Sequence, residues 1–138
     1  MQAGSLDGIT ILRAGRPPLV LYNGQAPARR RAFTLAHEVG HICLNHRDDN
    51  PQNEREANIF AANLLAPRIL LWEMGRQNGN TAPGTSQICN IFLISQRAAE
   101  LQLRGLPDSS EAFSDAEWCL LEIYKPLLPR ANEPDLGF

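Results

Sequence analysis

Residues 37–41 of the chain are His37-Glu38-Val39-Gly40-His41, inside a run that favours a helix. Because an α-helix turns about 100° per residue, the two histidines lie one turn apart on one face, with ~6 Å of rise between them. Two imidazoles at that spacing can both bind the same zinc ion, each through one ring nitrogen. Glu38 flanks the same face, where its carboxylate can take a proton from a zinc-activated water. The string therefore has the H-E-x-x-H pattern typical of zinc peptidases, although so short a pattern also recurs by chance.

A catalytic zinc site needs a third protein ligand, and a second helix further along the chain offers one. Asn50 is a good N-cap, Pro51 suits the first helical position, and Pro67 marks where this helix should end. Glu54 and Asn58 are four residues apart on the helix and share a face. We therefore expect Glu54 to be the third zinc ligand. Asn58 is expected to hydrogen-bond the free ring nitrogen of a zinc-bound histidine and so to fix its orientation.

A second glutamate on the same helix is an alternative ligand. Glu56 lies about 200° around the helix from Glu54, so the two cannot both face the metal. Glu54 is preferred because it alone has a polar partner, Asn58, one turn further on. Without the histidine motif, both glutamates would be interpreted as first-turn acids that the helix dipole favours.

Two longer segments resemble a known family. They are RAFTLAHEVGH at residues 31–41 and EREANIFAANLLAP at residues 54–67. Together they resemble the ImmA/IrrE-type metallo-endopeptidases, whose typical pattern is R-x-F-T-L-A-H-E-(L/I/V)-G-H followed by E-x-x-A-N-x-F-A-A-x-L-L-(M/A)-P. The chain departs visibly from that pattern at Ala66, where methionine is usual, and the change is conservative.

This resemblance implies a zinc metallo-endopeptidase, a hydrolase in which His37, His41 and Glu54 hold the zinc and Glu38 is the general acid/base. It also implies a cytoplasmic bacterial or phage enzyme that acts in transcription regulation by cleaving a helix-turn-helix transcriptional repressor. An alternative is a regulatory module that keeps the zinc fold, has little or no peptidase activity, and acts by gripping a repressor. Replacing Glu38 by glutamine separates the two, because only an enzyme should then lose its effect.

The chain before the histidine motif favours a β-hairpin. Residues 8–13 and 18–22 are apolar and β-branched, and residues 14–17 between them are typical of a turn. We predict an α+β fold in which this small antiparallel sheet packs on a zincin-like pair of helices, followed by a C-terminal helical segment. The second strand, from Leu19 to Tyr22, is the candidate edge beside which an extended substrate would lie.

The length of 138 residues suits a single metallopeptidase domain. We expect the hairpin region over residues 1–31, the zinc-site helices over 32–66, further helices over 67–125 and a tail over 126–138. The further helices are predicted over residues 68–77, 86–92, 95–104 and 114–124. Ser95 is an N-cap candidate, and residues 114–117 form a capping box.

The pair of helices over residues 86–104 superficially resembles a DNA-binding helix-turn-helix. Its second helix offers only Arg97 and Arg104 as cations, with Glu100 between them. A recognition helix normally lies in a clearly basic environment, so DNA binding is disfavoured.

The helix that carries the histidine motif is expected to begin near residues 32–34. An apolar stripe at helical spacing should face the core, and its members are Leu35, Val39, Ile42 and Cys43. A glycine inside a helix costs ~1 kcal/mol relative to alanine, so Gly40 indicates close approach of another backbone, that of the helix with Glu54. His46 is interpreted as a helix-end or loop histidine without a metal role.

Two further features leave alternatives open. The run Arg29-Arg30-Arg31 is interpreted as a solvated loop before the helix, or as a patch that seats an acidic substrate segment. The group that stabilises the oxyanion beside zinc is not assigned, and the candidates are Tyr22, His46 and Tyr124.

Composition is consistent with a cytoplasmic protein. The formal net charge is −2 and no long apolar run exists, so neither nucleic acid nor a membrane is an expected partner. The first residues lack the basic and apolar segments of a signal peptide. The three cysteines are far apart, which indicates free thiols in a reducing compartment. The chain starts almost directly at the sheet, so it is either a minimal family member or lacks a leading segment.

Overall fold

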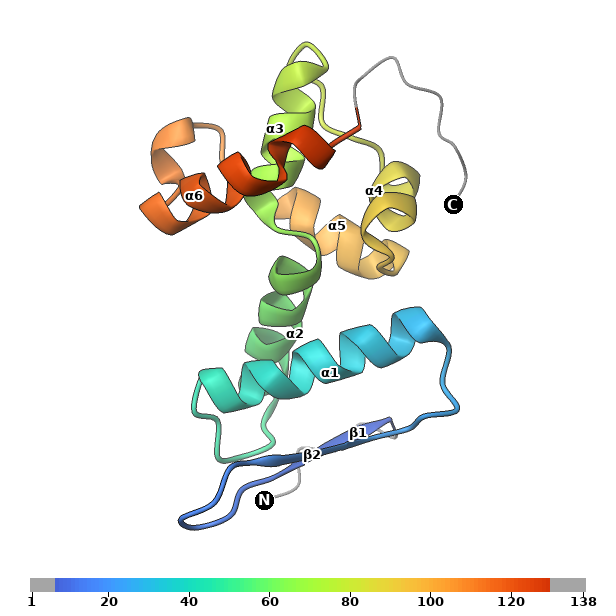
Figure 1. Ribbon diagram of the computed structural model, residues 1–138, viewed down its shortest axis with the longest axis vertical. Helices are drawn as coiled ribbons and strands as arrows, with labels where there is room; N and C mark the ends of the chain where they lie inside the picture. Colours follow the sequence, from blue (N-terminus) through green and yellow to red (C-terminus); the bar gives the residue numbers. More distant parts are fainter. Residues whose placement is uncertain (1–6, 130–138) are drawn as a thin grey trace. The chain divides into compact units, whose positions relative to one another are not determined.

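The computed structural model describes residues 7–129 and divides into two compact units, of which one ends at Leu65 and the other begins at Ala66 (Figure 1). The predicted tail over 126–138 lies outside the described residues from position 130 on. Among residues 7–129, no helix is both long and apolar enough to cross a bilayer.

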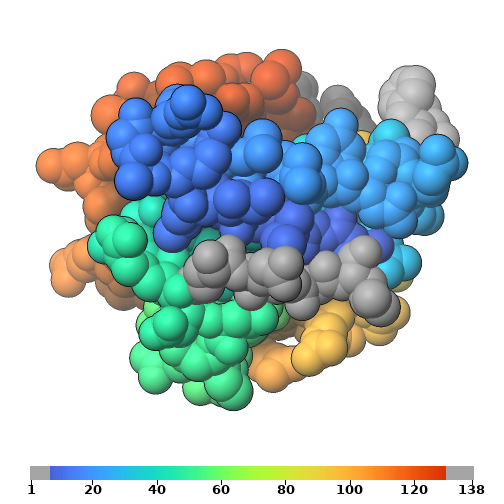
Figure 2. Space-filling view, turned by 90° about the horizontal axis from the view of Figure 1, so that it is seen from below, coloured from blue at the N-terminus to red at the C-terminus, as the bar shows by residue number. Residues whose placement is uncertain are grey.

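The first unit opens with an antiparallel hairpin of β1 (Gly8–Ile11) and β2 (Leu19–Tyr22), in which Gly8 is opposite Tyr22 and Ile11 opposite Leu19. Successive strand residues point to opposite faces, and here Gly8 and Thr10 are the buried ones. Both point at α1 (Ala28–Cys43), which the hairpin covers on one side (Figure 2). The small sheet with helices confirms the α+β prediction.

Helix α1 begins at Ala28, about one turn before the predicted start. Pro27 is the N-cap residue, in extended conformation, and the alanine and arginines that follow are good helix formers. The basic run therefore lies inside the first turns of α1, not in a loop before it. Positive charge is unfavourable at a helix N-terminus, and Arg30 is compensated by an ion pair with Asp7.

The prediction that the apolar stripe of α1 faces the core is wrong. Leu35 and Val39 are 36% and 38% exposed, and Cys43 is also exposed. The buried face of α1 consists instead of Thr34, Ala36, His37, Glu38, Gly40 and His41. The physical reason is that β1 and α2 pack on the polar and small residues, so helical periodicity identified an apolar stripe but not the side that neighbouring elements cover.

Helix α2 (Pro51–Leu65) has the predicted ends, and Asn50 Oδ1 accepts a hydrogen bond from the backbone N–H of Asn53 at 2.8 Å. It packs on α1 at Gly40, where an added Cβ would lie 3.0 Å from Cδ1 of Phe60. The glycine therefore marks a close approach of α2, as predicted, but the approaching group is an aromatic side chain and not a backbone.

The second unit consists of α3 (Arg68–Gln77), α4 (Thr85–Phe92), α5 (Gln96–Arg104) and α6 (Asp115–Tyr124), with 3-10 turns at Ser110–Ala112 and Lys125–Leu127. Its core gathers Ile69, Leu70, Phe113 and Leu121. The predicted N-cap at Ser95 and the capping box of Ser114 with Glu117 are both present. These local end signals explain why the helix bounds were predictable.

Candidate metal centre

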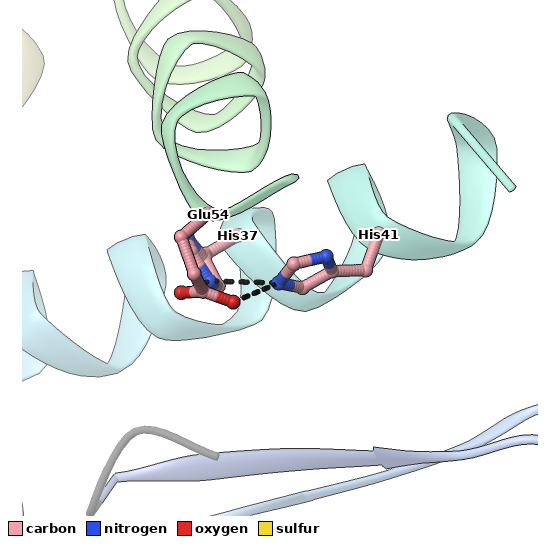
Figure 3. A group of neighbouring side chains, drawn as sticks. All are labelled: His37, His41 and Glu54. Atoms are coloured by element: carbon pink, nitrogen blue, oxygen red, sulfur yellow. Dashed lines mark hydrogen bonds and ion pairs between the residues drawn. The ribbon is translucent and has the colours of Figure 1, made fainter. Parts of the chain in front are cut away.

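Three predicted ligands meet where α1 and α2 face each other (Figure 3). The Nε2 atoms of His37 and His41 are 3.0 Å apart. One carboxylate oxygen of Glu54 lies 3.1 Å from the first nitrogen, and the other lies 2.9 Å from the second. Both histidines are buried, whereas the Glu54 side chain is about one-third exposed. The spacing of four within α1 brings the rings together, and the packing of α2 on α1 brings the carboxylate to them.

The protonation of these groups follows from their burial. Burial lowers the pKa of His41, and the neighbouring His37 ring lowers it further. The His41 ring is therefore held in the neutral form that metal ligation requires. Burial also raises the pKa of Glu54, and a hydrogen bond with Asp49 adds to this effect.

The donor set fits a zinc ion. Ligand atoms ~2.1 Å from a tetrahedral ion are separated by about 3.4 Å. The nitrogen and oxygen atoms of this cluster lie slightly closer together, 2.9 to 3.1 Å apart. Two imidazoles and one carboxylate are also a common ligand set of catalytic zinc, in which the fourth position is left to water. The residues present are therefore suited to hold the metal that the sequence predicts.

Glu38 is completely buried beside this cluster, and its two carboxylate oxygens have different surroundings. Thr10 of β1 donates its hydroxyl hydrogen to Oε2. Oε1 has no hydrogen-bond partner within residues 7–129. An unsatisfied buried oxygen costs roughly 1–3 kcal/mol, and more when it is charged, so its presence calls for a functional explanation. A general base with one oxygen held and the other free meets that description.

Gly8 lets β1 lie close against α1 beside Glu38. A Cβ at Gly8 would clash with Cγ2 of Thr34, and it would lie in ordinary contact, at 3.4 Å, with Oε1 of Glu38. Neither Gly8 nor Thr10 was singled out from the sequence. The available signal was a threonine at an inward position of an otherwise apolar strand, because a buried hydroxyl needs a polar partner.

Asn58 makes the contact that its spacing from Glu54 predicts. Its Oδ1 lies 2.8 Å from Nδ1 of His37, so the amide oxygen accepts the ring N–H when Nε2 is the metal-binding atom. The role of Asn58 in orienting a zinc ligand stays a prediction.

His46 lies just past the end of α1, as expected of a helix-end histidine, but it is not exposed there. It is buried, its Nδ1 lies 2.9 Å from Nδ1 of His41, and its Nε2 lies 2.7 Å from Oε2 of Glu56. Glu56 thus faces away from the three ligands, as expected, and its hydrogen bond from His46 lowers the pKa of its carboxyl. The missed signal was Asn45, a residue that tolerates the left-handed turn that ends α1.

The structure bears on the three candidates for the group that stabilises the oxyanion. Both ring nitrogens of His46 already have hydrogen-bond partners, which leaves no N–H to donate to an oxyanion. Tyr22 is opposite Gly8 and so lies on the sheet face toward α1, although it is 52% exposed. Tyr124 belongs to the other unit.

The basic run over residues 29–31 has a hydrogen bond within the first unit. Arg31 donates to the carbonyl of Gly24 at 3.4 Å, and the role of the run in seating an acidic substrate segment stays a prediction.

The fold and the clustered histidines and glutamates are those of a metallopeptidase-like protein. The chain belongs to the family of IrrE N-terminal-like domains, whose model matches residues 2–82. The matched segment contains the three predicted ligands, His37, His41 and Glu54.

Among characterised proteins, the chain is similar to the radiation response metalloprotease IrrE of Deinococcus radiodurans. The two are 28% identical over 95 residues, which cover 59% of this chain and 29% of that protein. The chain therefore corresponds to less than a third of that relative's length. No solved structure matches the chain.

Proposed function

We propose that the protein is a zinc-dependent endopeptidase. The observation that carries the proposal is the meeting of His37, His41 and Glu54 beside Glu38, a buried carboxylate of which one oxygen has no partner among the described residues. Family membership supports the same activity class. A purely structural zinc site would have four protein ligands and no need for an adjacent buried base.

In this proposal His37, His41 and Glu54 would hold the zinc, the histidines through their rings and Glu54 through its carboxylate. When bound, zinc supplies Lewis-acid activation of water and of the substrate carbonyl. Glu38 Oε1 accepts a proton from the attacking water and later gives it to the leaving amine. Thr10 keeps Oε2 occupied, so the carboxylate presents Oε1.

The proposal extends to the substrate class and to the cellular compartment. We infer that the protein acts in the cytoplasm on a helix-turn-helix transcriptional repressor, and the support for this is the close match of both motifs to the ImmA/IrrE-type pattern. The exposed, apolar strand β2 is a suitable edge for an extended substrate segment.

The first experiment measures metal content in the purified wild type, His37→Ala and Glu54→Ala. About one zinc per wild-type chain, lost in both variants, is the expected result. If the wild-type protein takes up no zinc when zinc is supplied, the zinc-dependent endopeptidase is excluded and the regulatory binding module remains as the candidate function.

The second experiment separates an enzyme from a binding module. Wild type and Glu38→Gln are incubated with co-encoded repressors, and both cleavage and binding are measured. An enzyme loses cleavage in Glu38→Gln while its zinc content is kept. A module that acts by gripping the repressor shows no cleavage in either protein and binds the repressor equally in both.

A further inference from the structure

The end of α1 folds the chain back on the metal centre. Asn45 adopts a left-handed conformation, with φ of 56°, which asparagine tolerates better than most residues. Its N–H donates to the carbonyl of Ile42 at 3.1 Å, and the N–H of His46 donates to the carbonyl of His41 at 2.9 Å. These two bonds define a Schellman motif. In this motif the residue after the left-handed position commonly contacts the residue five places earlier, and here that pair is His46 and His41.

The contact continues into a chain of polar side chains. The Nδ1 atoms of His41 and His46 are 2.9 Å apart, and Nε2 of His46 lies 2.7 Å from Oε2 of Glu56. The other Glu56 oxygen accepts a hydrogen bond from Gln52 at 3.2 Å. His46 is only 7% exposed, whereas the Glu56 side chain is 43% exposed. This series of hydrogen bonds thus runs from His41, a buried predicted ligand, to the partly exposed carboxylate of Glu56.

Metal binding by Nε2 of His41 determines which ring nitrogens of His41 and His46 carry protons. A neutral ring that binds through Nε2 carries its proton on Nδ1, so His41 must donate to Nδ1 of His46. His46, accepting at Nδ1, carries its own proton on Nε2 and donates it to Glu56. With both rings neutral, no other arrangement satisfies both hydrogen bonds. His37 differs because a neutral amide, Asn58, accepts its Nδ1 proton.

We propose that His46 and Glu56 are positioning residues for the metal centre, which hold His41 in the tautomer and ring orientation that zinc requires. This inference rests on the proposed function, since it presumes that His41 is a zinc ligand. Partners of this kind typically change metal affinity by 10–100-fold when they are removed. A residue that only caps α1 would change the stability of the helix and leave zinc affinity in the folded protein unaltered.

The test compares zinc dissociation constants, measured by competition with a chelating indicator, in wild type, His46→Leu and His46→Asn. His46→Leu removes the acceptor for His41, and we expect about 10–100-fold weaker zinc binding. The amide oxygen of asparagine lies near the position of Nδ1, so His46→Asn should bind zinc within a few-fold of wild type. Melting of each metal-free protein measures the structural contribution separately.

Glu56 provides a second pair of variants that does not disturb a buried position. We expect Glu56→Ala to weaken zinc binding severalfold, toward the lower end of the range for such partners, and Glu122→Gln, an exposed glutamate of α6, to leave it unchanged. In zinc-loaded wild type with ¹⁵N-labelled histidine rings, nuclear magnetic resonance should find the protons on Nδ1 of His41 and on Nε2 of His46.

The outcomes separate this inference from the proposed function. Wild-type protein that does not bind zinc overturns the proposed function and the positioning role together. Wild type that binds zinc no more tightly than His46→Leu overturns the positioning role alone. If His46→Leu does not fold, equal zinc affinity of Glu56→Ala and wild type, or a His46 ring protonated at Nδ1, overturns it.

Discussion

The two compact units bury different kinds of side chain. Among the described residues of the unit that ends at Leu65, the buried apolar residues are all alanines, at positions 26, 36, 57, 61 and 62. The larger side chains of its interior are polar, and they include His37, Glu38, His41 and His46. The other unit buries Ile69, Leu71, Ile88 and Phe113, with few polar groups among them. The first interior is thus organised around chemistry, and the second around apolar packing.

Two buried glutamates make the contrast specific. Glu73 in α3 receives hydrogen bonds from Arg76 at 2.6 and 2.7 Å and from Gln77 at 3.1 Å, with Lys125 at 3.4 Å. Chiefly because of Arg76, the pKa of Glu73 falls from 4.5 to about 2. Within residues 7–129, Glu38 in contrast has Thr10 as a hydrogen-bond partner at Oε2 and no partner at Oε1. A carboxylate with all its partners stabilises a fold, whereas one with a free oxygen is available to move a proton.

The substitution that separates the two roles most strongly is Glu38→Gln. We expect cleavage of the substrate to fall by about 10²–10⁴-fold, because the amide cannot act as a base. Zinc content and the free energy of unfolding should not decrease, because a neutral amide costs less to bury than a carboxylate. Cleavage rates, metal analysis and denaturation together check this. Cleavage at the wild-type rate would remove Glu38 from the mechanism.

The matching substitution in the second unit is Glu73→Gln. At pH 7 we expect the free energy of unfolding to fall by up to about 3 kcal/mol, with no change in zinc affinity. Since the folded pKa is lower than 4.5, the wild-type carboxylate stabilises the fold above pH 4.5, and its contribution disappears as the pH falls toward 2. Denaturation at pH 7 and pH 3 should therefore find a smaller difference between variant and wild type at pH 3. A difference that does not depend on pH would contradict the charge-based role.

A smaller effect is expected from Thr10→Val, which removes the hydroxyl group while preserving side-chain shape. Without the hydrogen bond to Oε2, the Glu38 carboxylate can rotate, and we expect about a tenfold lower cleavage rate, as for one lost hydrogen bond to a charged group. Thr10→Ser keeps the hydroxyl and should restore most of the rate. Steady-state kinetics on the three proteins check this, and equal impairment of both variants would indicate a packing effect instead.

The smallest effect tests the exposed face of α1. Cys43 belongs to the stripe that periodicity assigns to the core, yet it is exposed. Cys43→Ser should therefore change the free energy of unfolding by less than about 0.5 kcal/mol, as is usual for surface positions. Chemical denaturation measures it. A loss of several kcal/mol would mean that this side of α1 is covered in the folded protein.

Sequence alone was enough to predict the features that depend on neighbouring residues. The spacing of His37 and His41 follows from the period of a helix, and Glu54 and Asn58 share a face for the same reason. The bounds of α2 and α6 follow from capping by Asn50 and Ser114. The hairpin follows from two apolar runs separated by a turn. Each of these features depends on residues that are close in the sequence, so it can be predicted without knowing how the elements pack.

Packing decided what those local signals could not. The hydrogen bond from Thr10 to Glu38 joins residues 28 positions apart, and no periodicity relates them. His46 reaches His41 through a left-handed turn, and it reaches Glu56 only because α2 packs on α1. The same packing covers the polar face of α1 and leaves Leu35 and Val39 partly exposed. A helix pattern specifies which residues share a face, but only the neighbouring elements determine which face is buried.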